Sequence, residues 1–224
     1  KVVDLVSLYI TSDIETGDVT NPSFIISKWY RSFILNSGAV ADSLKDSTII
    51  SIDYRDEAVP LANFMASIEV GENPNSAVLI NNFKILCKGI YDEDNLLSNT
   101  FSSLSKVHPW DMELIWNVSL DLYNAKNLTS NNSGSILFFT ANGGVYNMNE
   151  DGTSITNVIP ISSDVLFVKT ESYAVNDTTN GYSNMLYIND AVNNPNTVYK
   201  FNQETDLFCD TIVVNAPVKD IAFY

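Results

Sequence analysis

The chain has 224 residues, 45% of them hydrophobic, and a formal net charge of −15 at pH 7. This length and apolar content suffice for one large or two small domains with a buried core, which excludes a disordered chain. The charge argues against nucleic acid or an anionic membrane surface as a partner, because the twelve Lys and Arg residues form no basic cluster. No apolar run reaches the ~20 residues of a membrane helix, so we expect no membrane insertion.

The beginning of the chain predicts a strand and an acidic turn. The strand is the apolar run Val2 to Ile10, and the turn contains Asp13, Glu15 and Asp18. Carboxylates at this spacing are compatible with a calcium ion. A solvated acidic loop is the favoured interpretation.

The clearest predicted helix lies near residues 22–35. Pro22 suits the first helical position, apolar residues recur at helical spacing as far as Ile34, and Gly38 follows. Weaker patterns predict strands at 47–53 and 77–87 and short helices at 58–68 and 95–104. Residues 1–106 are therefore predicted to be a mixed, β-rich region with a helix.

The sequence pattern changes at His108, and we place a domain boundary between residues 106 and 107. From Met112 to Leu122, apolar residues alternate with mostly polar ones, which predicts a half-buried strand. Residues 124–134 predict a polar loop. The second predicted region spans residues 107–224.

This second region contains two copies of a four-strand pattern, offset by about 50 residues. The first copy has strands at 136–140, 145–149, 155–159 and 165–169, and Asn142-Gly143 favours a tight hairpin turn. The second copy has strands at 185–188, 198–202, 211–214 and 217–224. Four antiparallel strands repeating every 40 to 50 residues or so are typical of β-propeller blades.

The residues of the repeat also resemble a known family. Phe138-Phe-Thr-Ala141, followed by Val145-Tyr-Asn-Met-Asn-Glu-Asp-Gly-Thr153, is similar to the YWTD-type propeller repeat, and TolB-like propellers share its second half. Tyr187-Ile-Asn-Asp190 is the corresponding tetrapeptide of the second copy, whereas Gln203-Glu-Thr-Asp206 lacks the glycine. The resemblance covers residues 134–224. It implies a scaffold, commonly non-enzymatic, that binds a protein or small ligand. Propellers with similar repeats also occur in phage tail proteins.

The predicted fold class is therefore all-β and mainly antiparallel, with propeller-like four-stranded blades and one or more short helices in the N-terminal half. A β-sandwich is the alternative. Two copies do not close a ring, which typically takes about four or more blades. Either residues 1–106 contain degenerate blades, or another chain or further sequence completes the ring.

One stretch resembles a metal loop. Asn147-Met-Asn-Glu-Asp151-Gly152 matches the first half of a calcium loop, but Val158 stands where the closing Glu belongs. A hairpin turn is favoured over a calcium site.

Other chemistry-bearing residues are few. His108 is the single histidine, which excludes a His-rich metal site and leaves one position for a nucleophile–His–acid triad; a structural role is favoured. Cys87 and Cys209 are interpreted as two separate buried thiols rather than a bridge. Strand aromatics are favoured as core residues over a sugar-stacking platform. The aromatic residues considered for that platform are Trp110, Trp116, Tyr123, Tyr146, Tyr182 and Tyr187.

We therefore expect a non-enzymatic structural or binding protein, with no catalytic, cofactor-binding or metal residue assigned. Its expected setting is a virion, of the phage tail type, or an extracellular assembly, where it meets protein partners, assembles with itself, or binds a carbohydrate or receptor. The alternatives are a carboxylate-dependent glycoside hydrolase, a calcium-dependent propeller hydrolase and a β-sandwich adhesin.

Overall fold

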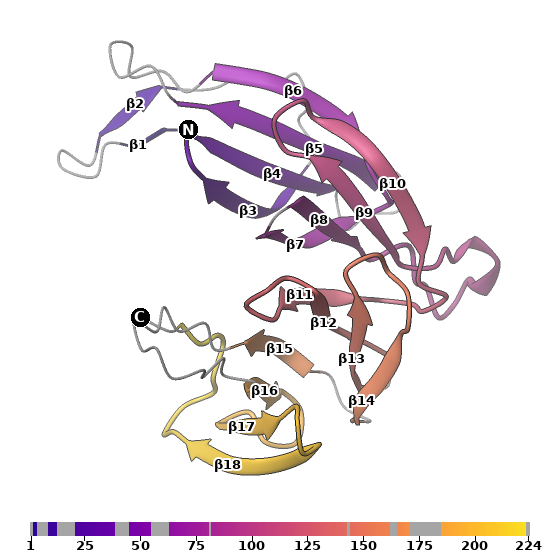
Figure 1. The fold of residues 1–224 in the computed structure, drawn as a ribbon, viewed down its shortest axis with the longest axis vertical. Coiled ribbons are helices and arrows are strands. Elements are labelled where there is room, and N and C mark those ends of the chain that lie inside the picture. The colour runs from indigo at the N-terminus through magenta and orange to yellow at the C-terminus, as the bar shows by residue number, and fades with distance from the viewer. Residues whose placement is uncertain are drawn as a thin grey trace. The chain divides into compact units, whose positions relative to one another are not determined.

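The computed structural model describes residues 2–3, 9–12, 21–38, 45–54, 63–80, 82–142, 144–161, 165–170 and 185–222. Within these ranges the chain is built almost entirely of β-strands and divides into two compact units, residues 1–119 and 120–224. Each unit contains two four-stranded antiparallel sheets (Figure 1). The predicted all-β fold class is confirmed.

The first unit is formed by strands that pair in sequence order. They are β1 (Val2–Val3), β2 (Ile10–Ser12), β3 (Pro22–Lys28), β4 (Arg31–Gly38), β5 (Lys45–Asp53), β6 (Asn63–Glu69), β7 (Pro74–Ile80), β8 (Asn82–Cys87), β9 (Ser103–His108) and β10 (Glu113–Ser119). One sheet has the order β3-β4-β5-β6 and the other has the order β10-β9-β8-β7, while β1 pairs with β2 alone.

An apolar layer holds the two large sheets of the first unit together. Strand β7 packs against β3 and β4. Phe33 from β4 and Phe83 from β8 are fully buried, with ring centroids 4.6 Å apart. Leu35, Ile49 and Ile85 complete the centre of this core. Each such side chain contributes roughly 1.5–3 kcal/mol by leaving water.

The second unit repeats this plan. Its strands are β11 (Lys126–Ser130), β12 (Ile136–Ala141), β13 (Gly144–Asn149), β14 (Thr156–Pro160), β15 (Val165–Thr170), β16 (Met185–Asp190), β17 (Thr197–Asn202) and β18 (Leu207–Val213). The sheet orders are β11-β12-β13-β14 and β15-β16-β17-β18. Phe138, Val168 and Ile188 belong to the buried core that the two sheets share.

The helix predicted near residues 22–35 is wrong, because these residues form the β3–β4 hairpin. Ile25 pairs with Ile34 and Ile26 pairs with Phe33 across the hairpin. Trp29 takes the turn with φ 57°. The apolar residues recur at a spacing that fits a hairpin as well as a helix, and the isoleucines have the branched side chains that strands favour.

Among the weaker predictions for residues 1–106, the strands are found and the helices are not. The strand at 47–53 is confirmed within β5, and the strand at 77–87 is a hairpin formed by most of β7 and all of β8. The helix at 58–68 is wrong where it is described, since residues 63–69 form β6. The helix at 95–104 is reduced to a single 3₁₀ turn, Leu96–Ser98, followed by β9.

Both predicted four-strand repeats are present, but each sheet begins one strand earlier than predicted. The predicted loop at 124–134 contains β11, which opens the sheet β11–β14. The strand predicted at 165–169 is β15, which begins the next sheet and does not end the first. The sequence-based boundary at residues 106 and 107 lies inside β9, whereas the compact units divide after Ser119.

Candidate functional site

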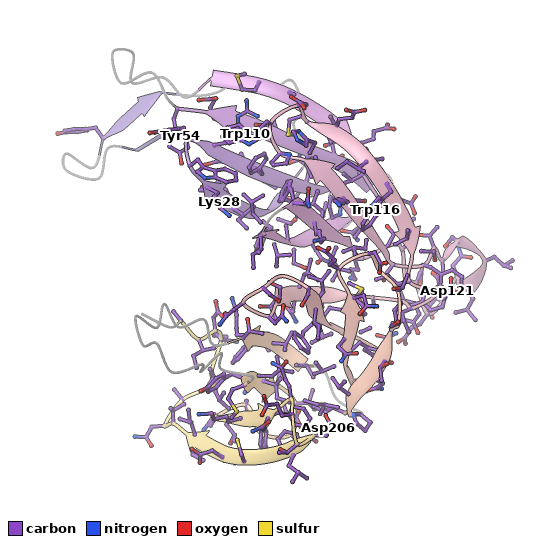
Figure 2. The ribbon with its side chains drawn as sticks, viewed as in Figure 1. Lys28, Tyr54, Trp110, Trp116, Asp121 and Asp206 are labelled. Carbon is purple, nitrogen blue, oxygen red and sulfur yellow. The ribbon has the colours of Figure 1, made fainter. Side chains whose placement is uncertain are left out.

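Exposed aromatic side chains gather at two turns and at the end of one strand of the first unit. Trp29 and Tyr30 form the β3–β4 turn, Tyr54 follows β5, and Trp110 lies in the β9–β10 turn. These side chains are between 40% and 55% exposed. We call the four residues the aromatic turn cluster. Figure 2 shows Tyr54 and Trp110 near Lys28, with Trp116 farther along β10.

Direct contacts join the members of the cluster. The indole rings of Trp29 and Trp110 lie 5.0 Å apart between centroids, tilted by 31°. The Tyr54 hydroxyl donates to the carbonyl oxygen of Trp29 at 3.2 Å, and the Tyr54 backbone N–H donates to the carbonyl oxygen of Tyr30 at 3.0 Å. Aromatic surface from both sheets of the unit therefore forms one patch.

Two cations border the tryptophans. The Lys28 Nζ lies 4.7 Å from the Trp29 ring centroid and donates to the carbonyl oxygen of Leu79 at 2.9 Å. The Arg31 guanidinium lies 5.0 Å from the Trp110 ring centroid. Cations at such distances are attracted to the negative faces of indole rings.

Arg31 positions the β9–β10 turn and with it Trp110. Its Nη1 donates to the carbonyl oxygens of Pro109 at 2.9 Å and Trp110 at 2.7 Å, and its Nε lies 3.4 Å from the Asp53 carboxylate. Arg31 and Asp53 are both buried, so the pair compensates the charge that the guanidinium brings into the interior.

His108 stands beside the cluster, in a contact local to the same turn. Its Nδ1 lies 2.9 Å from the Asp111 carboxylate and 3.3 Å from the Asp111 backbone nitrogen. Both side chains are well exposed to solvent.

The aromatic residues that the sequence suggested for a platform fall at different places. Trp110 belongs to the cluster, whereas Trp116 lies under the Lys106 ammonium at 5.9 Å. Tyr146 stacks on Phe139 at 5.6 Å, and Tyr187 is buried. Tyr123 belongs to the second unit and Tyr182 lies outside the described residues. Trp29 was missed because the helix prediction placed it on a core face.

The loop that resembles a calcium site is a tight turn after β13. The Asp151 Oδ1 accepts hydrogen bonds from the Thr153 hydroxyl at 2.6 Å and from its backbone N–H at 3.0 Å. Gly152 has φ 82° and donates to the carbonyl oxygen of Asn149 at 3.0 Å. The two hydrogen bonds from Thr153 hold the pKa of the Asp151 carboxyl below its usual value of 3.8, with the Thr153 hydroxyl as the largest cause.

Elsewhere in the described part of the chain, no three His, Cys, Asp or Glu side chains come together as a metal site. The acidic turn with Asp13, Glu15 and Asp18 lies outside the described residues.

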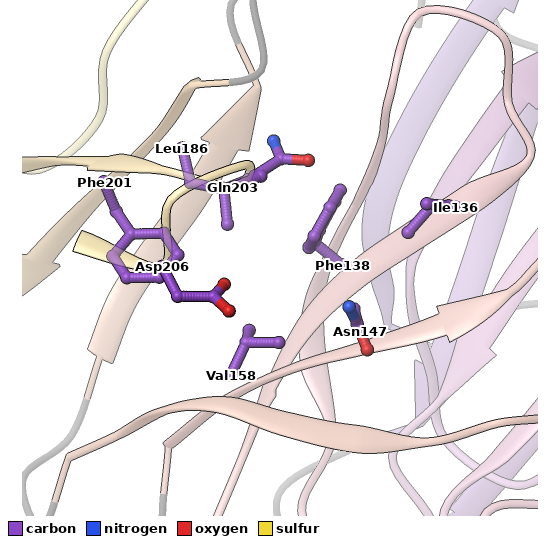
Figure 3. A pocket seen from close by; sticks show the side chains of 8 residues that line it. All are labelled: Ile136, Phe138, Asn147, Val158, Leu186, Phe201, Gln203 and Asp206. Carbon is purple, nitrogen blue, oxygen red and sulfur yellow. The ribbon is translucent and has the colours of Figure 1, made fainter. Parts of the chain in front are cut away.

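A small pocket opens between the two sheets of the second unit (Figure 3). It measures about 90 Å³, which is room for a few water molecules. Gln203 and Asp206 reach it from the β17–β18 turn. The remaining lining residues are Ile136, Phe138, Asn147, Val158, Leu186 and Phe201.

Both cysteines are free, as two separate thiols. Cys87 is fully buried in β8, and burial raises the pKa of its thiol to about 12. Cys209 on β18 is exposed, which corrects the prediction that it is buried.

Comparison with solved structures shows what the fold is. The WD40 domain of Neurospora crassa Pan2 matches 87% of this chain and 50% of its own, with a TM-score of 0.56 and 9% identity. This chain therefore has the fold of β-propeller blades. A chain of the nidogen/laminin complex matches with a TM-score of 0.51 and 13% identity, over 83% of this chain and 60% of its own. The dihydro-heme d1 dehydrogenase NirN matches with a TM-score of 0.56 and 9% identity, over 84% of this chain and 36% of its own.

These similarities are structural alone. No protein-family model matches the chain, and no curated protein matches it. The chain spans between 36% and 60% of the length of these three propeller proteins. The four described four-stranded sheets correspond to blades, so residues 22–119 contain the further blades that the sequence concealed. Among the described residues, no helix has the length and apolarity needed to span a bilayer.

Proposed function

We propose that the protein is a non-enzymatic interaction module that binds a protein partner through the aromatic turn cluster. The observation that carries this proposal is the packing of two exposed tryptophans, 5.0 Å apart, beside Arg31 and two exposed tyrosines. Trp, Tyr and Arg dominate the few residues that supply most of the energy of protein interfaces. Large apolar side chains that are fixed in place before binding also lose little conformational entropy on docking.

The contacts within the cluster favour a protein over a sugar. A sugar ring needs an open aromatic face on which to stack, and the Trp29 ring already faces both the Lys28 ammonium and the Trp110 ring. A protein surface can instead cover the whole patch of rings and cations. The hydrogen bonds from Arg31 to the carbonyl oxygens of Pro109 and Trp110 hold the turn that carries Trp110 in place for such a partner.

The proposed setting is a virion, of the phage tail type, or an extracellular assembly. The resemblance to propeller repeats supports a scaffold, and one similar propeller was solved in a complex of nidogen with laminin. The net charge of −15 supports a partner other than nucleic acid. We assign no catalytic residue and no cofactor.

The test compares the full chain with variants of the cluster in cells or particles of its source. The tagged protein and the variants Trp29→Ala and Trp110→Ala are cross-linked to their neighbours, which are identified by mass spectrometry. Leu97→Ala, on a side chain that is 100% exposed away from the cluster, is the matched control.

We expect one protein to bind the wild type and the control equally, and to bind each Trp variant at least ~30-fold more weakly when measured with the purified partner. Equal binding to the Trp variants would contradict the proposal. So would glycan-array binding that both Trp substitutions abolish, or hydrolysis of glycosides that depends on one Asp or Glu.

A further inference from the structure

The last described blade, β15–β18, has an apolar side chain layer on each of its two faces. Val168, Leu186 and Ile188 belong to the core shared with the sheet β11–β14. Phe167 and Tyr187 belong to a second cluster, because neighbouring residues of a strand point to opposite faces. We call the face that carries Phe167, Tyr187 and Val198 the outer face.

The segment after β18 returns across the outer face. Val218 and Ile221 pack against the cluster of Phe167, Tyr187 and Val198. The backbone N–H of Val218 donates to the carbonyl oxygen of Pro195 at 2.8 Å. Asp220 forms an ion pair with Lys169 of β15, at 3.4 Å.

The chain makes the same return where one blade of the first unit leads into the next. Val70 directly follows β6 and packs against the core between the two blades. Its backbone N–H donates to the carbonyl oxygen of Ser47 at 2.7 Å, as the N–H of Val214, directly after β18, donates to Asn196 at 3.0 Å. Three residues later the Asn73 N–H donates to the carbonyl oxygen of Asp46 at 2.9 Å, in β5, the third strand of its sheet. Pro195 lies just before β17, which is likewise the third strand of its sheet. The bond from Val218 to Pro195 therefore repeats the bond from Asn73 to Asp46, directly before β7 begins.

A third connection, within the second unit, has a similar sequence. Pro160-Ile161 is followed by Asp164-Val165 after two residues, and Pro217-Val218 is followed by Asp220-Ile221 after one. Ile161 and Val165 both pack on the core against the preceding blade, and Val165 begins β15, the innermost strand of the next one. By this correspondence Val218 and Ile221 take the positions of Ile161 and Val165.

We propose that residues 217–222 hold the position of the innermost strand of a fifth blade, and that the outer face of β15–β18 is the docking surface for the other three strands of that blade. The occupant is an antiparallel sheet with an apolar face, supplied by the same polypeptide, because this chain already provides its first strand. Ile212 pairs across the sheet with Val198 of the outer face and is 42% exposed, so apolar surface of the outer face is left uncovered beside the C-terminal segment.

The position of the segment is tested in the chain itself. Val218→Asp and Ile221→Asp place a charge on the outer face, whereas Lys219→Asp changes an exposed side chain between them. We expect both apolar-site variants to unfold at a lower temperature than the wild type and to bind more of a dye specific for exposed apolar surface. The Lys219 variant is expected to match the wild type. Equal behaviour of all three variants would overturn the proposal.

The occupant is tested by supplying the missing strands. A second copy of residues 171–214, which contain β16, β17 and β18, is appended after Tyr224. We expect amide exchange of residues 217–222 to slow at least tenfold and the melting temperature to rise, because each added repeat buries a face of its neighbour. The same extension on the Ile221→Asp variant is expected to give neither effect.

Two results would overturn the proposed occupant. One is a folded extension that leaves the exchange of residues 217–222 unchanged. The other is a dimer of the unextended chain, measured by light scattering, that Ile212→Asp converts to a monomer, since a second copy would then cover the outer face.

Discussion

The guanidinium of Arg31 donates a hydrogen bond to the carbonyl oxygen of Trp110 at 2.7 Å, across 79 residues of sequence. Arg31 begins β4 and Trp110 lies in the β9–β10 turn, so this bond joins the two blades of the first unit. The exposed indole of Trp110 is thus fixed by a buried cation that belongs to the neighbouring blade. Loss of Arg31 would leave the Asp53 carboxylate and two backbone carbonyls without this donor.

Replacement of Arg31 by Ala is expected to lower the free energy of unfolding by about 3 kcal/mol, because it removes one partner of a buried ion pair and with it the donor to two backbone carbonyls. Urea denaturation of the full chain measures the change. Lys219→Ala, which removes an exposed cation, is the control and is expected to stay within about 0.5 kcal/mol of the wild type. An Arg31 variant as stable as this control would show that the anchor has no energetic role.

The two tryptophans of the cluster are expected to stabilise each other by about 0.5–1.5 kcal/mol beyond their burial, because their rings pack at 5.0 Å. A double-mutant cycle on Trp29→Ala and Trp110→Ala, followed by urea unfolding, measures this coupling. The pair Trp29 and Trp116 serves as the reference and is expected to be additive. Additive effects of Trp29 and Trp110 would mean that the rings touch without net attraction.

Local sequence signals predicted the second unit better than the first. Gly144, with φ 145°, ends a turn that the sequence marked with Asn142, and the flanking strands pair as expected. The β3–β4 hairpin carries no such signal, since Trp29 adopts a positive φ at its turn without a glycine or asparagine. Tertiary packing rather than turn chemistry therefore decides that hairpin, and packing cannot be read from residue spacing.

The candidate site could not be predicted for a related reason. Its residues come from two turns and the end of β5, and Trp29 and Trp110 are brought together because β7 packs against β3 and β4. The sequence shows that Trp110 follows a His-Pro pair, but it contains no sign of which residue lies opposite. The buried Arg31 was also missed, because the predicted helix at 22–35 placed this cation off its apolar face.

The two thiols are expected to react very differently with an aromatic disulfide reagent. Burial raises the pKa of Cys87 to about 12, so its thiol stays protonated at pH 8, whereas Cys209 is exposed. One thiol should react at once in the native protein and two should react in denaturant. Cys209→Ser is expected to abolish the fast reaction, and fast labelling of this variant would contradict the burial of Cys87.

The same thiol makes stability depend on pH in the alkaline range. Because the folded state raises the pKa of Cys87 above 9.0, the thiol favours folding below pH 9 and loses that contribution as the pH rises toward 12.

The Asp151 turn is expected to weaken in acid. The Thr153 hydroxyl and backbone N–H stabilise the charged carboxylate, so the folded state lowers the pKa of Asp151 below 3.8. The contribution of this group to stability is therefore present above pH 3.8, the pKa of the unfolded state, and is lost as the pH falls through the lower pKa of the folded state. Carboxyl chemical shifts followed by NMR during an acid titration measure the folded pKa directly.

Two variants of Thr153 test the cause of this shift. Thr153→Ala removes the shortest bond to Asp151, at 2.6 Å, and is expected to return the pKa toward 3.8. Thr153→Ser keeps the hydroxyl and should preserve the low pKa. If the Ala and Ser variants titrate alike, the hydroxyl is not the main cause, and the backbone N–H of residue 153 must hold the carboxylate instead.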